Sequence, residues 1–360
     1  VYKRQLKEHL EKRTAGGVYL TTIQKFEEST GLLSNRANII CISDEAHRSQ
    51  AGLGQKTTIT EKGVKHHYGF AKYLRDSLPN ATYVGFTGTP LDNTLDVFGP
   101  IVDRYTMTEA VADEITRKIV YEGRAAKIMI DSVKVKEIEL FYDQCKQEGS
   151  SDYQIEESKK MMTRIDVILN DPDLLAKIAQ DIVEHYEKRI EEGSTVLGKA
   201  MIVCSSRSIA WNLYQAIIHL RPEWAEIKEC IEGETLSEKE RKEIKPMPRI
   251  AMVITRDKDN DSDELYNLLG NDEYRKTLDN QLQVEKSNFK IAIVVDMWIT
   301  GFDVPSLDTM YCFKPLQMHT LIQTISRVNR VYPGKEKGLV VDYLGIKQQM
   351  NEALHQYGGN

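Results

Sequence analysis

Short apolar runs alternate with amphipathic stretches along the first quarter of the chain. Three runs are short and rich in β-branched or aromatic residues, which predicts buried strands: Val18–Ile23, Ile39–Ser43 and Tyr83–Phe86. Between the last two, apolar residues recur at helical spacing before Pro79 and Asn80, at Phe70, Ala71, Leu74 and Leu78. Strands that alternate with helices predict a parallel α/β sheet.

The pattern changes between Tyr105 and Gly193, where the sequence is charged and favours helices. Asp171 followed by Pro172 predicts a helix start, with the acid as cap and proline in the first turn. An apolar stripe follows, formed by Leu175, Ile178, Ile182 and Tyr186. Segment 146–160 is polar and predicts a loop. The simplest interpretation of the whole region is a linker with helices packed on neighbouring lobes.

A second α/β unit is predicted from about Lys199. Its candidate strands are the apolar runs Ala200–Cys204, Ile250–Ile254, Ile291–Val295, Thr309–Phe313 and Gly338–Asp342. The polar segment 260–283 predicts a loop with a short helix. The expected fold class is therefore α/β, with two parallel-sheet lobes joined by a helical segment.

Composition agrees with a globular protein of about two domains. The 360 residues are 41% apolar and 28% charged, and no apolar run is long enough to span a bilayer. The start has no apolar signal segment and no Met, so we expect a fragment of a cytoplasmic protein. Five scattered cysteines without a CxxC pair disfavour zinc or disulfides. A net charge of −6 leaves nucleic-acid binding open.

The strongest chemical signal is Asp44-Glu45-Ala46-His47, at the end of a predicted strand. Nucleotide hydrolysis needs one acid to hold Mg2+ and a second carboxylate to orient and deprotonate water. Open α/β sheets bind ligands at the carboxyl ends of their strands, where this pair lies. An acidic turn without function is the simpler interpretation. His47 has no second histidine at ligand spacing, so coupling to the neighbouring lobe is its expected role.

Two further motifs strengthen the hydrolase interpretation. Thr87-Gly88-Thr89-Pro90 follows another predicted strand, and its hydroxyls can hydrogen-bond back to the carboxylates; a plain turn is the alternative. On a helix, Gln323, Arg327 and Arg330 would share one face. Two guanidinium groups so placed can stabilise charge during phosphoryl transfer. Without context, this would be an ordinary surface arginine pair.

Together these motifs resemble the DEAH-box motor of superfamily 2 helicases, which has two RecA-like lobes. Asp44–His47 is similar to the Walker B motif, Thr87–Pro90 to motif III and Gln323–Arg330 to motif VI, with Ser326 in place of Gly. Further matches in order are a first-lobe DNA-contacting motif at 21–26, motif IV at 200–207 and motif V at 294–303. The sequence segments SDEAHRSQ, GFTGTPL and ISRVNRVYPGKEKGLVVDY resemble the R subunit of type I restriction enzymes.

The resemblance implies an ATP-dependent translocase of double-stranded DNA within a restriction endonuclease. Its cofactors would be ATP and Mg2+, and its partners duplex DNA and the methyltransferase and specificity subunits, with no membrane. Asp44 would bind Mg2+, Glu45 would activate water, and Gln323, Arg327 and Arg330 would complete the site. His47, Thr87 and Thr89 would couple hydrolysis to movement. Gly301 and Asp303 would contact the nucleotide, and Thr22, Arg207 and Thr300 would hold DNA phosphates.

The resemblance also implies boundaries. Residues 1–105 would be the C-terminal part of the first lobe, 106–195 a connecting helical segment, 196–346 the second lobe and 347–360 a tail toward a further domain. The phosphate loop and nuclease domain would lie upstream, so the chain alone is expected to turn over ATP near baseline. Gly193–Ala200 matches GxxxxGK by letter, but it follows a predicted helix and precedes a strand, the reverse of a phosphate loop.

Two other functions stay open. A strand-separating helicase of the same superfamily would release a labelled strand from a partial duplex, whereas a translocase would not. A non-catalytic scaffold for the methyltransferase core would have no physical need for the Asp44-Glu45 pair or for paired arginines.

Overall fold

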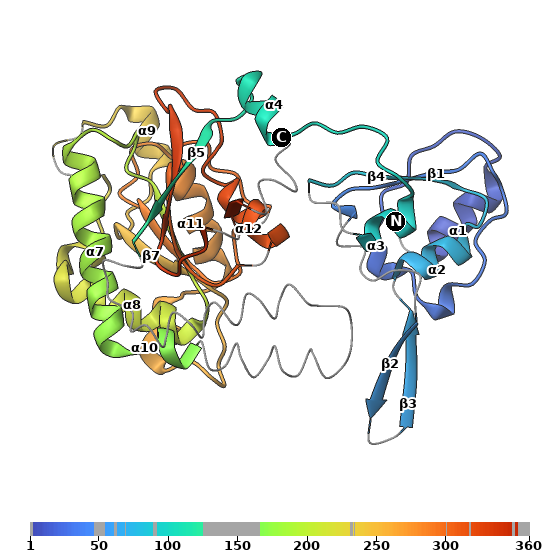
Figure 1. Ribbon diagram of the computed structural model, residues 1–360, viewed down its shortest axis with the longest axis horizontal. Helices are drawn as coiled ribbons and strands as arrows, with labels where there is room; N and C mark the ends of the chain where they lie inside the picture. The colour runs from blue at the N-terminus through green and yellow to red at the C-terminus, as the bar shows by residue number, and fades with distance from the viewer. Residues whose placement is uncertain are drawn as a thin grey trace. The chain divides into compact units, whose positions relative to one another are not determined.

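The computed structural model describes residues 3–46, 55–60, 63–68, 70–88, 92–124, 166–230, 233, 235–299, 301–316, 318–347 and 350–351. The chain divides into two compact units, residues 1–105 and 106–360 (Figure 1). The predicted loop at 146–160 lies outside the described residues.

The first unit is organised around two parallel strands. Its elements are α1 (Lys3–Lys12), β1 (Ile40–Ser43), β2 (Gln55–Thr60), β3 (Gly63–Tyr68), α2 (Phe70–Ser77), β4 (Thr82–Gly85) and α3 (Asp92–Phe98), with short 3-10 turns at Ile23–Lys25 and Glu28–Thr30. Strand β1 pairs with β4 from Ile40 opposite Thr82 to Ser43 opposite Gly85. Strands β2 and β3 form a separate antiparallel hairpin. The predicted helix at 70–78 is confirmed, because α2 buries Ala71 and Leu74.

One of the three predicted strands of this unit is wrong. Residues 18–22 are extended but belong to no strand, and a 3-10 turn begins at Ile23. Val18 is 90% exposed and Leu20 is 80% exposed. A strand needs a hydrogen-bonded neighbour, and the described residues supply none here. The apolar sequence alone was therefore not enough to form a strand.

The second unit contains a six-stranded sheet in the order β5-β10-β9-β6-β8-β7, and every neighbouring pair is parallel. The strands are β5 (Lys118–Gly123), β6 (Ala200–Cys204), β7 (Ile250–Val253), β8 (Ile291–Val294), β9 (Thr309–Phe313) and β10 (Lys337–Asp342). The predicted strands of this unit are thus confirmed. With a parallel pair in one unit and a parallel sheet in the other, the α/β class is confirmed as well.

The helices of the second unit are α4 (Met107–Ala112), α7 (Pro172–Glu191), α8 (Arg207–Leu220), α9 (Glu238–Glu243), α10 (Asp263–Leu268), α11 (Asp272–Gln283) and α12 (Met318–Ile325), with a 3-10 turn at Pro222–Ala225. Helix α7 lies across one face of the sheet (Figure 1). Its predicted start is confirmed, because the Asp171 side chain accepts a hydrogen bond from the Leu174 N–H at 3.0 Å. Its predicted stripe is buried on the sheet.

Two segments differ from expectation. The region 106–195, expected to be a helical connector, contains strand β5, which completes one edge of the sheet beside β10. The segment 260–283, expected to be a loop with a short helix, forms two helices, α10 and the twelve-residue α11. Ser262 and Asn271 cap these helices, accepting hydrogen bonds from Leu265 and Tyr274. The polar composition reflects solvent-facing helices rather than a loop.

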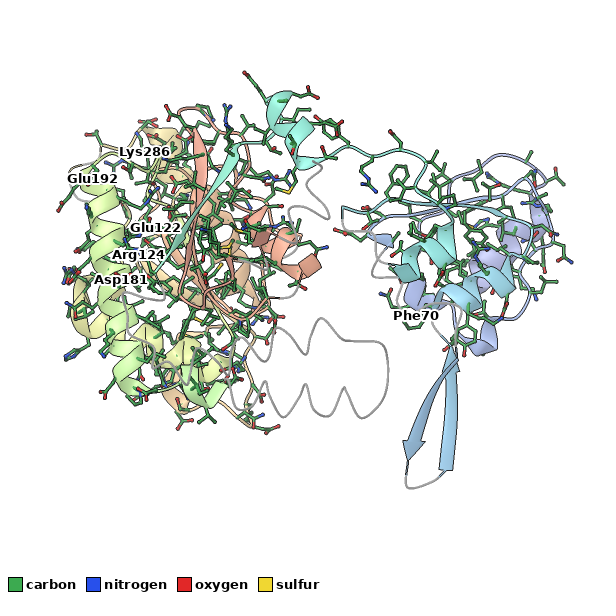
Figure 2. The ribbon with its side chains drawn as sticks, viewed as in Figure 1. Phe70, Glu122, Arg124, Asp181, Glu192 and Lys286 are labelled. Carbon is green, nitrogen blue, oxygen red and sulfur yellow. The ribbon has the colours of Figure 1, made fainter. Side chains whose placement is uncertain are left out.

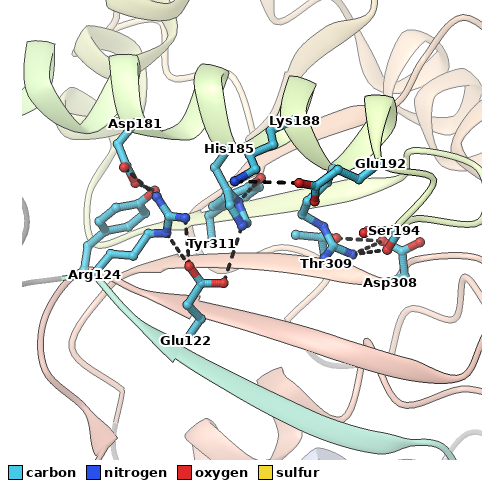
Figure 3. A network of polar contacts seen from close by, with 12 residues as sticks. Glu122, Arg124, Asp181, His185, Lys188, Glu192, Ser194, Asp308, Thr309 and Tyr311 are labelled. Atoms are coloured by element: carbon cyan, nitrogen blue, oxygen red, sulfur yellow. Dashed lines mark hydrogen bonds and ion pairs between the residues drawn. The ribbon is translucent and has the colours of Figure 1, made fainter.

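Partly buried charges anchor β5 to helix α7 (Figures 2 and 3). Arg124, directly after β5, forms ion pairs with Glu122 at 2.7 Å and with Asp181 of α7 at 2.6 Å. His185 lies on the same helix, 3.5 Å from Glu122, and its Nδ1 is 3.0 Å from the Tyr311 hydroxyl. Burial, and then the Arg124 charge, lower the pKa of His185 to about 4. The imidazole is therefore neutral near pH 7.

Among the described residues, no helix combines the length and apolarity that crossing a membrane requires.

Candidate functional site

The Asp44-Glu45 pair forms a tight turn where β1 ends. The Asp44 Oδ1 accepts a hydrogen bond from the Glu45 N–H at 2.8 Å, and both residues are exposed. Glu45 has a φ of +48°, in the left-handed region that few residues other than glycine adopt. Such strain is often found at functional sites, and here two consecutive exposed acids follow the carboxyl end of a parallel strand.

This turn is fastened to the strand that leads to Thr87. The Phe86 N–H donates to the Ser43 carbonyl at 2.8 Å, and the Ala46 N–H donates to the Phe86 carbonyl at 2.9 Å. Ala46 is 1% exposed. A Cβ added at Gly85 would lie 3.0 Å from the Ala46 Cβ and 2.9 Å from the Phe98 ring, so a side chain here would force these neighbours to shift. The first two motifs are therefore one packed structure.

Thr87 is half-buried, directly after the Phe86 that binds Ala46. Thr22 is exposed at the N-terminus of the 3-10 turn Ile23–Lys25. The other predicted residues of the first two motifs, His47 and Thr89, lie outside the described residues.

The carboxylates at the turn fit a magnesium site shared with a nucleotide. Mg2+ prefers oxygen ligands and is usually held by one or two carboxylates together with substrate phosphates. Asp44 and Glu45 offer such exposed oxygens. Within the described parts of the chain, no group of three or more His, Cys, Asp or Glu could hold a metal on protein ligands alone.

In the second unit, the structure brings the predicted residues of motifs V and VI together. The Arg330 Nε lies 3.1 Å from the Asp303 Oδ1, and both side chains are about half exposed. The Arg327 Nη1 donates to the Phe302 carbonyl at 2.6 Å. Gly301 is exposed with a φ of +74°. Thr300, predicted to hold DNA, lies outside the described residues.

The helix that would place Gln323, Arg327 and Arg330 on one face does not extend over all three residues. Helix α12 ends at Ile325, and Arg327 lies in the following turn. The Arg327 Nε donates to the Gln323 carbonyl at 3.2 Å, which satisfies an acceptor at the helix end. Arg330 instead forms an antiparallel bridge with Thr116. Arg327 is thus held at a helix end, and the Arg330 backbone lies in a bridge, so these residues do not share one helical face.

The bridge also involves the segment before β5. The Arg117 N–H donates to the Asn329 carbonyl at 2.6 Å. Nearby, Lys335 is 3% exposed and donates to the Pro305 carbonyl at 2.8 Å. Burial lowers the pKa of the Lys335 ammonium to about 8. The bridge between Thr116 and Arg330 could not be predicted from the sequence, because nothing in residues 116–117 indicates a partner more than two hundred positions away.

Arg207, predicted to hold DNA phosphate, is the first residue of α8, and Ser205 and Ser206 separate it from the end of β6. Its Nη1 donates to the Thr255 carbonyl, and its Nη2 pairs with the Asp261 carboxylate. Asp261 was missed because it lies in a polar segment without a motif.

The GxxxxGK decoy is confirmed as a structural turn. Gly193 follows α7, and Lys199 directly precedes β6. Lys199 is fully buried, and its ammonium donates to the carbonyls of Leu282 and Val284 at the end of α11. Burial lowers its pKa to about 7. The lysine caps a helix and has no phosphate-loop geometry.

Family comparisons agree with this arrangement. A SWI2/SNF2 ATPase family model matches residues 2–155, and a model of type I restriction enzyme subunit R domain 3 matches residues 198–345. A solved fragment of a putative HsdR subunit from Vibrio vulnificus aligns with 81% of this chain and 44% of its own, at 15% identity and a TM-score of 0.49.

Two curated relatives extend the match across both units. The type I restriction enzyme HindI endonuclease subunit of Haemophilus influenzae is 38% identical over 98% of this chain and 32% of its own length. The putative MjaIXP endonuclease subunit of Methanocaldococcus jannaschii is 34% identical over 97% of this chain and 30% of its own length. The chain therefore spans about a third of these relatives. Over nearly its whole length, the chain is homologous to endonuclease subunits of type I restriction enzymes, and its first part is similar to SWI2/SNF2 ATPases.

Proposed function

We propose that this chain is part of the motor of an R subunit. The subunit uses ATP hydrolysis to translocate double-stranded DNA and acts together with methyltransferase and specificity subunits. The observation that carries the proposal is the strained Asp44-Glu45 turn, exposed at a strand end and bonded to the segment before Thr87. An acidic surface loop has no need for this backbone conformation or for the close packing at Gly85.

In this proposal Asp44 holds Mg2+, which when bound neutralises charge on the nucleotide phosphates. Glu45 orients the attacking water and accepts its proton. Arg327 and Arg330, with Gln323, stabilise the charge on the transferred phosphoryl group. Gly301 and Asp303 contact the nucleotide. The ion pair with Asp303 holds Arg330 until ligand binds.

Coupling and DNA contact are assigned to the other predicted residues. His47, Thr87 and Thr89 transmit hydrolysis to movement. Thr22, Arg207 and Thr300 hold DNA phosphates, where hydroxyl and guanidinium groups supply contacts that do not depend on base sequence.

The test is DNA-stimulated ATP hydrolysis by the full-length subunit, with the methyltransferase core added in a second series. Glu45→Gln is expected to lower turnover by about 100-fold or more, the range of general base catalysis, while nucleotide binding persists. Asp76→Asn is the matched control, because Asp76 is an exposed acid of the same unit that pairs with Lys72.

Turnover that depends on duplex DNA and is lost in Glu45→Gln supports the translocase. Release of a labelled strand from a partial duplex would instead favour a strand-separating helicase. If the folded subunit hydrolyses no ATP with duplex DNA, the non-catalytic scaffold replaces the translocase as the better explanation.

A further inference from the structure

The loop between β7 and α10 holds the Arg207 side chain in one orientation. The Arg207 Nη1 donates to the Thr255 carbonyl at 2.5 Å, and its Nη2 pairs with the Asp261 carboxylate. These two contacts use two of the five N–H groups of a guanidinium. The Arg207 side chain keeps 30% of its surface exposed. It is therefore fixed on one edge and open to solvent on another.

Asp261 itself is closed off from any ligand. Its side chain is 1% exposed. Its Oδ2 accepts a hydrogen bond from the Asp257 N–H at 2.7 Å, so both oxygens are engaged within the protein. Arg256 stacks on the Tyr266 ring at 4.4 Å and secures the same loop. Asp261 therefore makes no direct contact with a bound molecule, and Arg207 is the exposed side chain through which it can act on one.

We propose that Asp261 is a positioning residue that orients Arg207 toward a phosphate of the duplex DNA backbone. The inference rests on the proposed function, in which Arg207 holds phosphate. A free arginine loses rotamer freedom when it binds. A buried carboxylate that fixes the guanidinium beforehand removes part of that loss, and it directs the planar group for charge-assisted hydrogen bonds.

The direction in which a substitution at Asp261 changes DNA affinity distinguishes a positioning role from a simple electrostatic effect. Asp261→Asn removes one negative charge near the DNA, and by Coulomb attraction alone this strengthens binding to phosphate. Positioning predicts the opposite, because an amide holds a guanidinium less firmly than a carboxylate does. Weaker binding by Asp261→Asn cannot arise from the charge change itself.

The experiment measures binding of a short fluorescent duplex DNA by the whole chain at fixed salt. Four proteins are compared: wild type, Asp261→Asn, Arg207→Gln and the double variant. We expect about tenfold weaker binding by Asp261→Asn, the size of one lost charge-assisted contact. In the Arg207→Gln background the same change should have no effect, because the two residues act as a pair.

Asp259→Asn is the matched control, since it removes the same charge from an exposed position in the same loop. It is expected to leave binding unchanged or slightly stronger. Thermal unfolding of each variant ensures that binding is compared between folded proteins. If Asp261→Asn does not fold, Asp261→Glu replaces it, because the longer carboxylate keeps the charge and shifts the guanidinium.

Equal or stronger binding by folded Asp261→Asn overturns the inference while leaving the proposed function intact. So does a loss that persists without Arg207, since Asp261 would then act elsewhere. Failure of the wild-type chain to bind duplex DNA overturns both this inference and the assignment of Arg207 to phosphate.

Discussion

At the scale of single residues, Gly85 connects the predicted catalytic turn to the rest of its unit. It lies at the end of β4 opposite Ser43, and its missing side chain allows Ala46 to approach. The turn at Asp44 and Glu45 is therefore stabilised by the packing of Ala46 on Gly85 as well as by backbone hydrogen bonds.

Gly85→Ala is expected to destabilise the chain by about 1–3 kcal/mol, the usual cost of overpacking. The added methyl group would lie 2.9 Å from the Phe98 ring and 3.0 Å from the Ala46 Cβ. Denaturant unfolding followed by fluorescence measures the change. Gly88→Ala is the control, because an added Cβ there meets nothing within 4 Å. Equal stability of the two variants would show that the turn does not depend on this contact.

At the scale of elements, the local sequence predicted strands correctly where the apolar pattern was strong and a neighbouring strand was available to pair with. Strands β6, β7 and β8 of the second unit are fully apolar and buried runs, as expected for a sheet covered on both faces. Residues 18–23 have similar composition, but strand formation depends on a partner that sequence does not reveal. Strand β5 was missed for the converse reason, since its partner β10 is more than two hundred residues away.

The candidate site was predictable in part, for the same physical reason. The Asp44-Glu45 turn follows its strand directly, so local pattern located it. Asp261 and the Thr116–Arg330 bridge depend on tertiary contacts, and no local signal indicates them. The roles assigned to the motif residues stay predictions until turnover and binding are measured.

Lys199 illustrates how a strand supports a neighbouring helix. Its ammonium is the donor for two carbonyls at the end of α11. Lys199→Met keeps much of the side-chain volume but leaves these acceptors unpaired, so we expect a loss of about 1–3 kcal/mol of stability.

Nucleotide affinity of folded Lys199→Met should equal that of wild type, since the lysine belongs to no phosphate loop. Urea unfolding and fluorescent-nucleotide titration measure the two quantities. Lys188→Met serves as control, because Lys188 is 69% exposed on α7 and should change stability by less than about 0.5 kcal/mol. Loss of nucleotide binding without loss of stability would restore the decoy as a real site.

At the scale of the whole molecule, the second unit depends on sequence that lies before its predicted boundary. Strand β5 completes the sheet edge, and α7 covers one face of the sheet. Ion pairs between Arg124 and Asp181 join these two elements, and Tyr343 adds a hydrogen bond to Asp181 at 2.8 Å. The described residues of the region 106–195 are thus a structural part of the second unit and not a connector.

Because His185 lies inside this charge network, the second unit should lose stability in acid. Its folded pKa is about 4, against 6.5 for an ordinary histidine. The unfolded chain therefore binds more protons between these values, and stability falls as pH falls through that window. The contribution is on the order of 1 kcal/mol for each pH unit. Protonation also places a second cation beside Arg124, which loosens the attachment of β5 to α7.

His185→Gln removes the titration while keeping a polar group beside Tyr311. Its unfolding free energy, measured in urea from pH 7 to pH 4, should therefore fall less steeply than that of wild type over the same window. His219→Gln should retain the wild-type slope, because His219 is exposed on α8. If all three proteins share one slope, His185 is protonated without cost in the folded chain, and the attachment of β5 does not depend on a neutral imidazole.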